Sequence, residues 1–114
     1  VRLAPLFAGI LADQAAGRPV SYIARRFHET VAAMIEQLCR RIAAEAGIQT
    51  VALSGGCFQN RLLTRLAVGR LRAAGLQVLL HRQVPPNDGG LALGQAVAGH
   101  FLLAHGTTGT TRDA

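Results

Sequence analysis

Two short glycine-containing stretches hold the residues whose types and spacing could support chemistry. The first, SGGC at 54–57, follows the apolar run TVAL, and the second, PPNDGG at 85–90, follows the apolar run LQVLL. Glycine has no Cβ atom, so the backbone at Gly55 and Gly56 can approach a ligand closely and can take positive φ. Spacing alone leaves two interpretations open: a ligand-binding turn, or a tight turn whose glycines serve only steric needs.

A helix is predicted to start near Phe58, directly after the first stretch. Its free N–H groups and positive dipole end would suit a phosphate or another anion. Asn60, in the first turn, could then reach a hydroxyl or a base of the ligand. Cys57 is a conceivable nucleophile at this position, but no histidine lies near it in sequence to act as a base. We interpret Cys57 as a small, partly buried side chain.

Asp88 lies between two prolines and two glycines, Gly89 and Gly90. A carboxylate there can cap the last helix or bind a metal, with the glycines leaving room for a nucleotide. A metal site needs several ligands, and one aspartate supplies one. The four histidines fall on different elements without metal-binding spacing: His28, His81, His100 and His105. Spacing alone therefore favours the cap.

Hydrophobic periodicity and glycine positions predict an α-α-β-α-β-α order. The predicted helices are residues 5–16, 20–46, 58–74 and 88 or 89 to 104, and the predicted strands are 49–54 and 76–81. Strand, helix and strand form one parallel βαβ unit with a right-handed crossover. The nearly continuous apolar character of 76–81 predicts burial on both faces of that strand.

The two glycine-containing stretches follow the two predicted strands. Ligands of open α/β sheets sit beyond the carboxyl ends of the strands, so we expect these stretches to meet at one sheet edge. Two strands make a poor sheet alone. We therefore expect either further strands outside this sequence or self-association through the open sheet edge.

Composition excludes several classes of protein. The chain has 114 residues, enough for one core, and its net charge of +6 comes from scattered arginines without interleaved aromatic residues, which argues against nucleic-acid binding. No apolar run reaches the roughly twenty residues of a membrane span, and two cysteines without a CxxC pattern indicate a cytoplasmic protein.

The chain opens without an initiator Met, so we expect a segment of a longer protein, with residues 1–105 in one domain and 106–114 as a disordered tail.

Three motifs together resemble the C-terminal end of the hydrogenase-maturation carbamoyltransferases, the HypF family. They are IARRFHETVA, LSGGCFQNRLL and PPNDGGLALGQA, and the resemblance extends to about Leu103. It implies that this α/β segment is part of an actin/sugar kinase/Hsp70-like domain. It also implies an enzyme that uses carbamoyl phosphate and ATP to form a carbamoyl-adenylate. The carbamoyl group then passes to the C-terminal cysteine of the partner HypE, on the way to [NiFe]-hydrogenase.

The resemblance also implies roles for individual residues. Gly55, Gly56 and Asn60 lie in the nucleotide site, and Gly89 and Gly90 lie near the nucleotide phosphates. Asp88 is a ligand of a divalent metal, for which the sequence does not distinguish zinc, iron and magnesium.

The sequence departs from the family pattern in three respects. The family's pair of metal-binding histidines and its upstream domains are not found here, so we expect the isolated segment to be inactive. Cys57 replaces a small apolar residue, which removes it as a nucleophile, and His28 matches the family's FH pair with only a structural role expected. Two alternatives stay open: an O-carbamoyltransferase of the same fold acting on a small molecule, and a stand-alone nucleotide-binding or interaction module.

Overall fold

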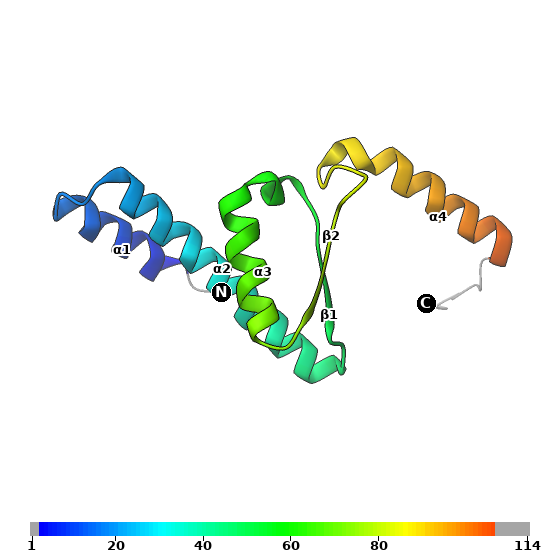
Figure 1. Ribbon diagram of the computed structural model, residues 1–114, viewed down its shortest axis with the longest axis horizontal. Coiled ribbons are helices and arrows are strands. Elements are labelled where there is room, and N and C mark those ends of the chain that lie inside the picture. The colour runs from blue at the N-terminus through cyan, green and yellow to red at the C-terminus, as the bar shows by residue number, and fades with distance from the viewer. Residues whose placement is uncertain (1–2, 107–114) are drawn as a thin grey trace, which may run out of the picture.

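The computed structural model describes residues 3–106, and it confirms the predicted order of elements (Figure 1). The helices are α1 (Ala4–Ala15), α2 (Val20–Ala46), α3 (Arg61–Ala73) and α4 (Leu91–His105), and the strands are β1 (Thr50–Leu53) and β2 (Gln77–Leu80). Two short 3-10 turns, η1 (Gly56–Gln59) and η2 (Asp88–Gly90), precede α3 and α4. Apart from Gly106, the predicted disordered tail lies outside the described residues.

Glycine ends the long helix α2 where the sequence predicts. Gly47 adopts φ 68°, and its N–H donates to the Ala43 carbonyl at 2.9 Å. A side chain is disfavoured in this left-handed conformation, whereas glycine adopts it without steric cost. The predicted boundaries of α2, residues 20–46, are therefore confirmed.

The strands β1 and β2 pair in parallel, as the βαβ prediction requires. The register joins Thr50 to Gln77 at one end and Leu53 to Leu80 at the other. Because parallel strands run in the same direction, the residues that follow Leu53 and Leu80 lie at the same edge of the sheet.

The core lies between α2, α3 and the sheet. Its buried side chains are Ala32, Ala43, Leu53, Leu63, Ala67, Leu71 and Leu76. Alanines of α2 and α3 let the two helix backbones approach closely, and the leucines fill the space toward the strands. Helices α1 and α4 extend from this centre toward opposite ends of a molecule measuring 60 × 32 × 31 Å (Figure 1).

The prediction that β2 is buried on both faces is wrong within this chain. Leu79 is 51% exposed and Leu80 is 39% exposed. Val51 and Val78 pack against the core, whereas Leu79 pairs with Ala52 on the opposite face, because side chains alternate along a strand. Helices of the described chain cover only the first of these two faces.

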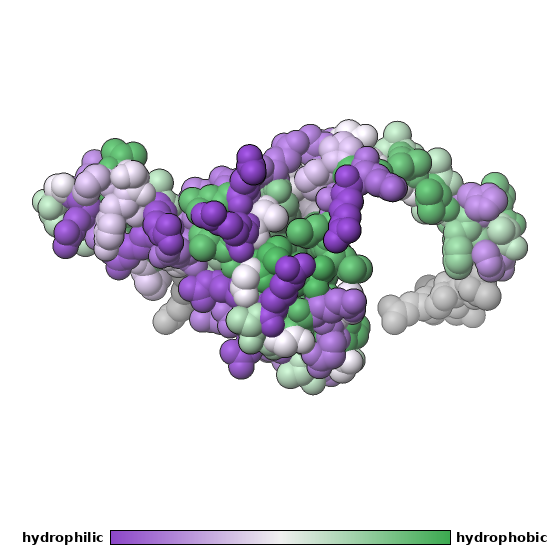
Figure 2. Space-filling model, viewed as in Figure 1, coloured by the Kyte–Doolittle hydropathy of each residue, from purple (hydrophilic) through white to green (hydrophobic). Residues whose placement is uncertain are grey.

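Apolar side chains gather over the strands and along α4 (Figure 2). No residue of α4 is buried, and Val97 and Phe101 are largely exposed. None of the helices formed by residues 3–106 is long and apolar enough to cross a membrane.

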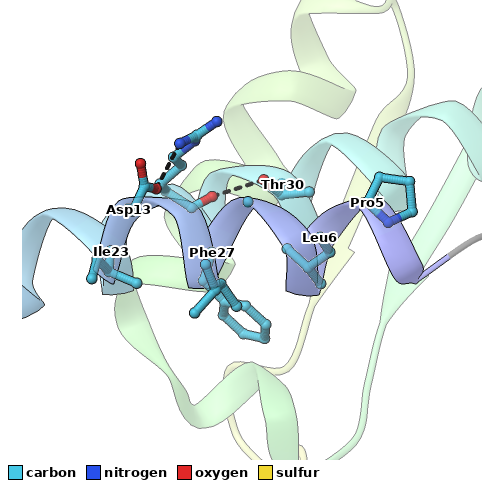
Figure 3. A pocket seen from close by; sticks show the side chains of 9 residues that line it. Pro5, Leu6, Asp13, Ile23, Phe27 and Thr30 are labelled. Carbon is cyan, nitrogen blue, oxygen red and sulfur yellow. Dashed lines mark hydrogen bonds and ion pairs between the residues drawn. The ribbon is translucent and has the colours of Figure 1, made fainter. Parts of the chain in front are cut away.

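Helix α1 packs along the N-terminal half of α2 and encloses a hollow of about 160 Å³ (Figure 3). Asp13 of α1 accepts a 2.6 Å ion-paired hydrogen bond from Arg26 of α2 beside this hollow. The apolar side chains of Leu6, Ile23 and Phe27 line it. This hollow lies away from both glycine-containing stretches.

Candidate functional site

The carboxyl ends of β1 and β2 bring the two glycine-containing stretches together. The backbone N–H of Gly55 donates to the Pro86 carbonyl at 2.7 Å. One residue earlier, the Ser54 hydroxyl lies 2.9 Å from Nε2 of His81. The predicted convergence of the two stretches at one sheet edge is therefore confirmed.

A cavity of about 490 Å³ opens where the two stretches meet. Three of the predicted site residues line it, Gly55, Asp88 and Gly90, whereas the other three, Gly56, Asn60 and Gly89, do not. The start of α4 forms the opposite wall, with Leu91, Gly94 and Gln95.

Sequence reasoning missed Ser54, His81 and Gln95 as residues of this cavity. For Ser54 and His81 a signal existed, since each is the first residue after its strand. In a parallel pair with aligned strand ends, those two positions lie side by side. Gln95 lies in the PPNDGGLALGQA motif, but the sequence does not show that its side chain lines the cavity, because this depends on the direction in which α4 leaves η2.

The two glycines of the first stretch differ in their conformations. Gly55 adopts φ 104° and ψ 158°, a combination essentially restricted to glycine. Gly56 has no positive φ, and a Cβ atom placed on it would meet nothing within 4 Å. The fold therefore requires glycine at position 55, and internal packing gives no reason for glycine at position 56.

The prediction that a helix begins near Phe58 is wrong in detail. The chain first forms η1, breaks at Asn60, and begins α3 at Arg61. The break arises because Asn60 has extended backbone angles, φ −69° and ψ 107°, as an N-cap residue does.

The side chain of Asn60 is engaged in the fold. Its Oδ1 accepts hydrogen bonds from the N–H groups of Leu62 and Leu63, both at 3.0 Å, and so caps α3. Its Nδ2 lies 2.9 Å from Nε2 of His28 on α2. The role of Asn60 toward a nucleotide stays a prediction, while its role at the start of α3 is structural.

Close packing of η2 against the preceding residues 84–87 explains the second pair of glycines. A Cβ atom on Gly90 would lie 2.7 Å from Cγ1 of Val84 and 2.8 Å from the Pro85 carbonyl oxygen. On Gly89 it would lie 3.1 Å from Oδ1 of Asn87. Position 90 requires glycine for this internal reason, whatever binds in the cavity.

The cap role favoured for Asp88 is wrong. The side chain of the preceding residue, Asn87, accepts the N–H of Gly89 at 3.1 Å and caps η2. Asp88 is exposed in the cavity wall, and no ion pair to its carboxylate forms among residues 3–106. Asn87 takes the cap because its side chain precedes the turn, and the Asp88 carboxylate stays available to a ligand.

This part of the chain holds no complete metal site. Residues 3–106 contain no group of three or more His, Cys, Asp or Glu side chains close enough to hold a metal ion. Cations of the kind bound by oxygen need several ligands. Asp88 can therefore supply one ligand, and any others would come from outside these residues.

A family model described as "Carbamoyltransferase, Kae1-like Domain, second subdomain" matches residues 1–95. The chain belongs to the HypF carbamoyltransferase family. It is 44% identical over 93 residues to carbamoyltransferase HypF2 of Cupriavidus necator, an alignment that covers 82% of this chain and 11% of the relative. It is 42% identical over 76 residues to carbamoyltransferase HypF of Synechocystis, covering 67% of this chain and 9% of that relative.

Solved HypF structures share the fold of this chain. A full-length HypF in a phosphate- and nucleotide-bound form superposes with a TM-score of 0.78 at 44% identity, covering 82% of this chain and 13% of that one. HypF of T. kodakarensis gives a TM-score of 0.78 at 30% identity, covering 91% and 14%. The predicted α/β class is confirmed, and the chain spans about a tenth of the length of its HypF relatives.

Proposed function

We propose that this chain forms one wall of the nucleotide site of a carbamoyltransferase and supplies one ligand of a divalent metal through Asp88. The enzyme uses carbamoyl phosphate and ATP to form a carbamoyl-adenylate. It then transfers the carbamoyl group to the C-terminal cysteine of HypE during maturation of [NiFe]-hydrogenase. Two free thiols, Cys39 and Cys57, fit the cytoplasmic location that goes with this function.

The observation that carries the proposal is the meeting of the two glycine-containing stretches in one cavity. The bond from Gly55 to Pro86 fixes the SGGC turn beside η2, and the cavity between them has room for part of a nucleotide. The position beyond the carboxyl ends of parallel strands is where α/β sheets bind ligands. A HypF relative of known structure, 44% identical to this chain, holds phosphate and a nucleotide.

The glycine turn suits a phosphate for a local reason. The backbone N–H groups of Gly56 and Cys57 follow directly after the cavity-lining Gly55, at the start of η1, and have no partner within residues 3–106. Orphan N–H groups of this kind donate readily to anionic oxygens. Since no Cβ stands on Gly56, a phosphate oxygen can approach this backbone closely.

Asp88 suits a metal because it is a charged oxygen ligand on the same cavity. A metal held there would neutralise negative charge that develops on phosphate or carbamoyl oxygens during transfer. The residues of this chain would hold and orient the nucleotide around that charge. Residues 85–90 are kept in place by the packing of Gly90 under Val84 and Pro85.

The proposal is tested in a chimera in which residues 1–95 replace the matching segment of the full-length C. necator HypF2. We expect the Asp88→Asn chimera to lose metal content and carbamoyl transfer to HypE. Its free energy of unfolding should stay within about 0.5 kcal/mol of the parent, because the side chain is exposed and caps nothing. Metal analysis, transfer to HypE and urea unfolding provide the three measurements.

Glu45→Gln is the control, since it neutralises another exposed carboxylate, one that pairs with Arg41 on α2 and does not line the cavity. It should leave metal content and transfer unchanged. An Asp88→Asn chimera with full metal occupancy and normal transfer would remove Asp88 from the metal site. A parent chimera that binds no ATP would refute the nucleotide site itself.

A further inference from the structure

His28 lies on α2, and it contacts the start of α3 through the side chain of Asn60, 32 residues later in the chain. His28 Nδ1 lies 2.7 Å from the Ala24 carbonyl oxygen, and its Nε2 lies 2.9 Å from Nδ2 of Asn60. Asn60 Oδ1 accepts the two N–H groups at the start of α3. These contacts form one continuous chain of hydrogen bonds from α3 to α2.

Every hydrogen bond in this series has its donor on the side of α3 and its acceptor on the side of Ala24. A carbonyl oxygen only accepts, so His28 Nδ1 carries the proton that bonds to Ala24. Nε2 is then a bare acceptor, which takes an N–H of the Asn60 amide, and the amide oxygen takes the N–H groups of Leu62 and Leu63. Hydrogen bonds arranged in one direction polarise and strengthen one another.

This series of hydrogen bonds allows only one orientation of the Asn60 amide and one tautomer of the His28 imidazole. A flipped Asn60 amide would turn its NH₂ group toward the N–H groups of α3 and its oxygen toward the Nε2 lone pair. An imidazole with its proton on Nε2 would set that N–H against the amide N–H. Helix α2 therefore fixes the His28 ring, and the His28 ring fixes the Asn60 amide. Helix α2 is itself anchored in the core, where its residue Ala32 is fully buried.

We propose that His28 is a positioning residue for the glycine turn. By orienting the Asn60 amide it fixes where η1 ends and α3 begins, and so it sets the position of the Gly56 and Cys57 N–H groups. A second bond, from the Thr64 hydroxyl to the Phe58 carbonyl at 2.8 Å, ties η1 to α3 from the other side. The functional half of this inference rests on the proposed nucleotide site.

The structural half is tested by NMR on the protein labelled with ¹⁵N at histidine. The ring nitrogens of His28 should show the neutral tautomer with the proton on Nδ1. In the Asn60→Ser variant, which keeps an N-cap oxygen but loses the long amide donor, the Nε2 resonance should shift. An Nε2–H tautomer in the parent protein, or an unchanged Nε2 resonance in Asn60→Ser, would overturn the inference.

The functional half is tested by ATP binding to the chimera described above. His28→Leu should weaken ATP binding roughly three- to tenfold, the effect expected for one net hydrogen bond. His28→Gln, whose amide oxygen can take the place of Nε2 as acceptor, should recover most of the affinity. Adding His28→Leu to Asn60→Ser should cause no further loss, because the link is already broken.

If His28 had only a structural role, its variants would affect stability and ATP affinity differently. In that case His28→Leu lowers the melting temperature while ATP affinity stays unchanged, or its effect multiplies with that of Asn60→Ser. Either result would overturn the positioning role while leaving the proposed function standing. A parent chimera that binds no ATP would instead refute the proposed function and the functional half of this inference, and the NMR result would still decide the hydrogen-bond link.

Discussion

The backbone N–H of Gly55 donates a 2.7 Å hydrogen bond to the carbonyl oxygen of Pro86, and this bond joins the two glycine-containing stretches across the sheet edge. The two residues follow different strands and are brought together only by the parallel register. The bond also holds Gly55 in a conformation, φ 104° and ψ 158°, that is essentially restricted to glycine.

In the chimera, Gly55→Ala should mainly lower stability, whereas Gly56→Ala should mainly lower ATP affinity. Alanine at position 55 must adopt φ 104° or distort the turn, so it should cost about 1–3 kcal/mol of unfolding free energy. The Cβ of alanine at position 56 would meet no atom within 4 Å among residues 3–106, so this change should alter stability by less than about 0.5 kcal/mol. Its methyl group would enter the proposed phosphate position, so ATP affinity should fall about tenfold, or about 1.4 kcal/mol. Urea unfolding and ATP titration measure the two effects, and an unchanged ATP affinity in Gly56→Ala would contradict the proposed position of the phosphate.

Gly90→Ala should destabilise the protein, whereas Gly99→Ala should stabilise it. The new Cβ at position 90 would lie 2.7 Å from Val84 and 2.8 Å from the Pro85 carbonyl, and such overpacking costs about 1–3 kcal/mol. At position 99, within α4, the new Cβ meets nothing within 4 Å. Replacing glycine by alanine in a helix gains up to about 1 kcal/mol. Urea unfolding decides between these expectations, and equal stability of the two variants would show that Gly90 is not tightly packed.

The thiols Cys39 and Cys57 should differ in their rates of alkylation. Partial burial raises the pKa of the Cys39 thiol above its usual 9.0, so less thiolate is present at any given pH. Cys57 is exposed, so the prediction that its side chain is partly buried is wrong. Cys57 should react first with iodoacetamide at pH 8, and the rate at Cys39 should still rise above pH 9. The same shift makes the stability contributed by Cys39 present at neutral pH and lost as the pH rises through the raised value. Mass spectrometry of single Cys→Ser variants follows each thiol, and equal rates at pH 8 would contradict the observed burial.

The sheet should mediate self-association of the isolated chain. Within residues 3–106, each strand has one edge that pairs with no other strand, and Leu79 is exposed on the uncovered face. Sedimentation velocity should show oligomers that increase with concentration, and Leu79→Lys should shift them toward monomer. Leu103→Lys, the same change at an 88% exposed position of α4, is the control and should have a smaller effect. A monomer at every concentration would refute association through the sheet.

Local chemistry in the sequence was sufficient for the order of the elements and for both ends of α2, whereas the starts of α3 and α4 were misplaced because short 3-10 turns precede them. The end of α2 at Gly47 follows from the freedom of glycine to take positive φ, and the two strands follow from short β-branched or apolar runs. Parallel pairing follows from the helix between them. Together these features also predicted that residues 54–57 and 85–90 meet, because the carboxyl ends of parallel strands share an edge.

The tertiary structure alone decided which side chain does what at that edge. Asn60 and His28 are far apart in sequence, and only the packing of α2 on α3 shows that they bond. The cap of η2 went to Asn87 and not to Asp88, because backbone angles determine which side chain can reach the free N–H. The exposure of Leu79 likewise depends on tertiary structure. The apolar pattern of a strand indicates that a face is to be buried, but it does not indicate which element covers that face.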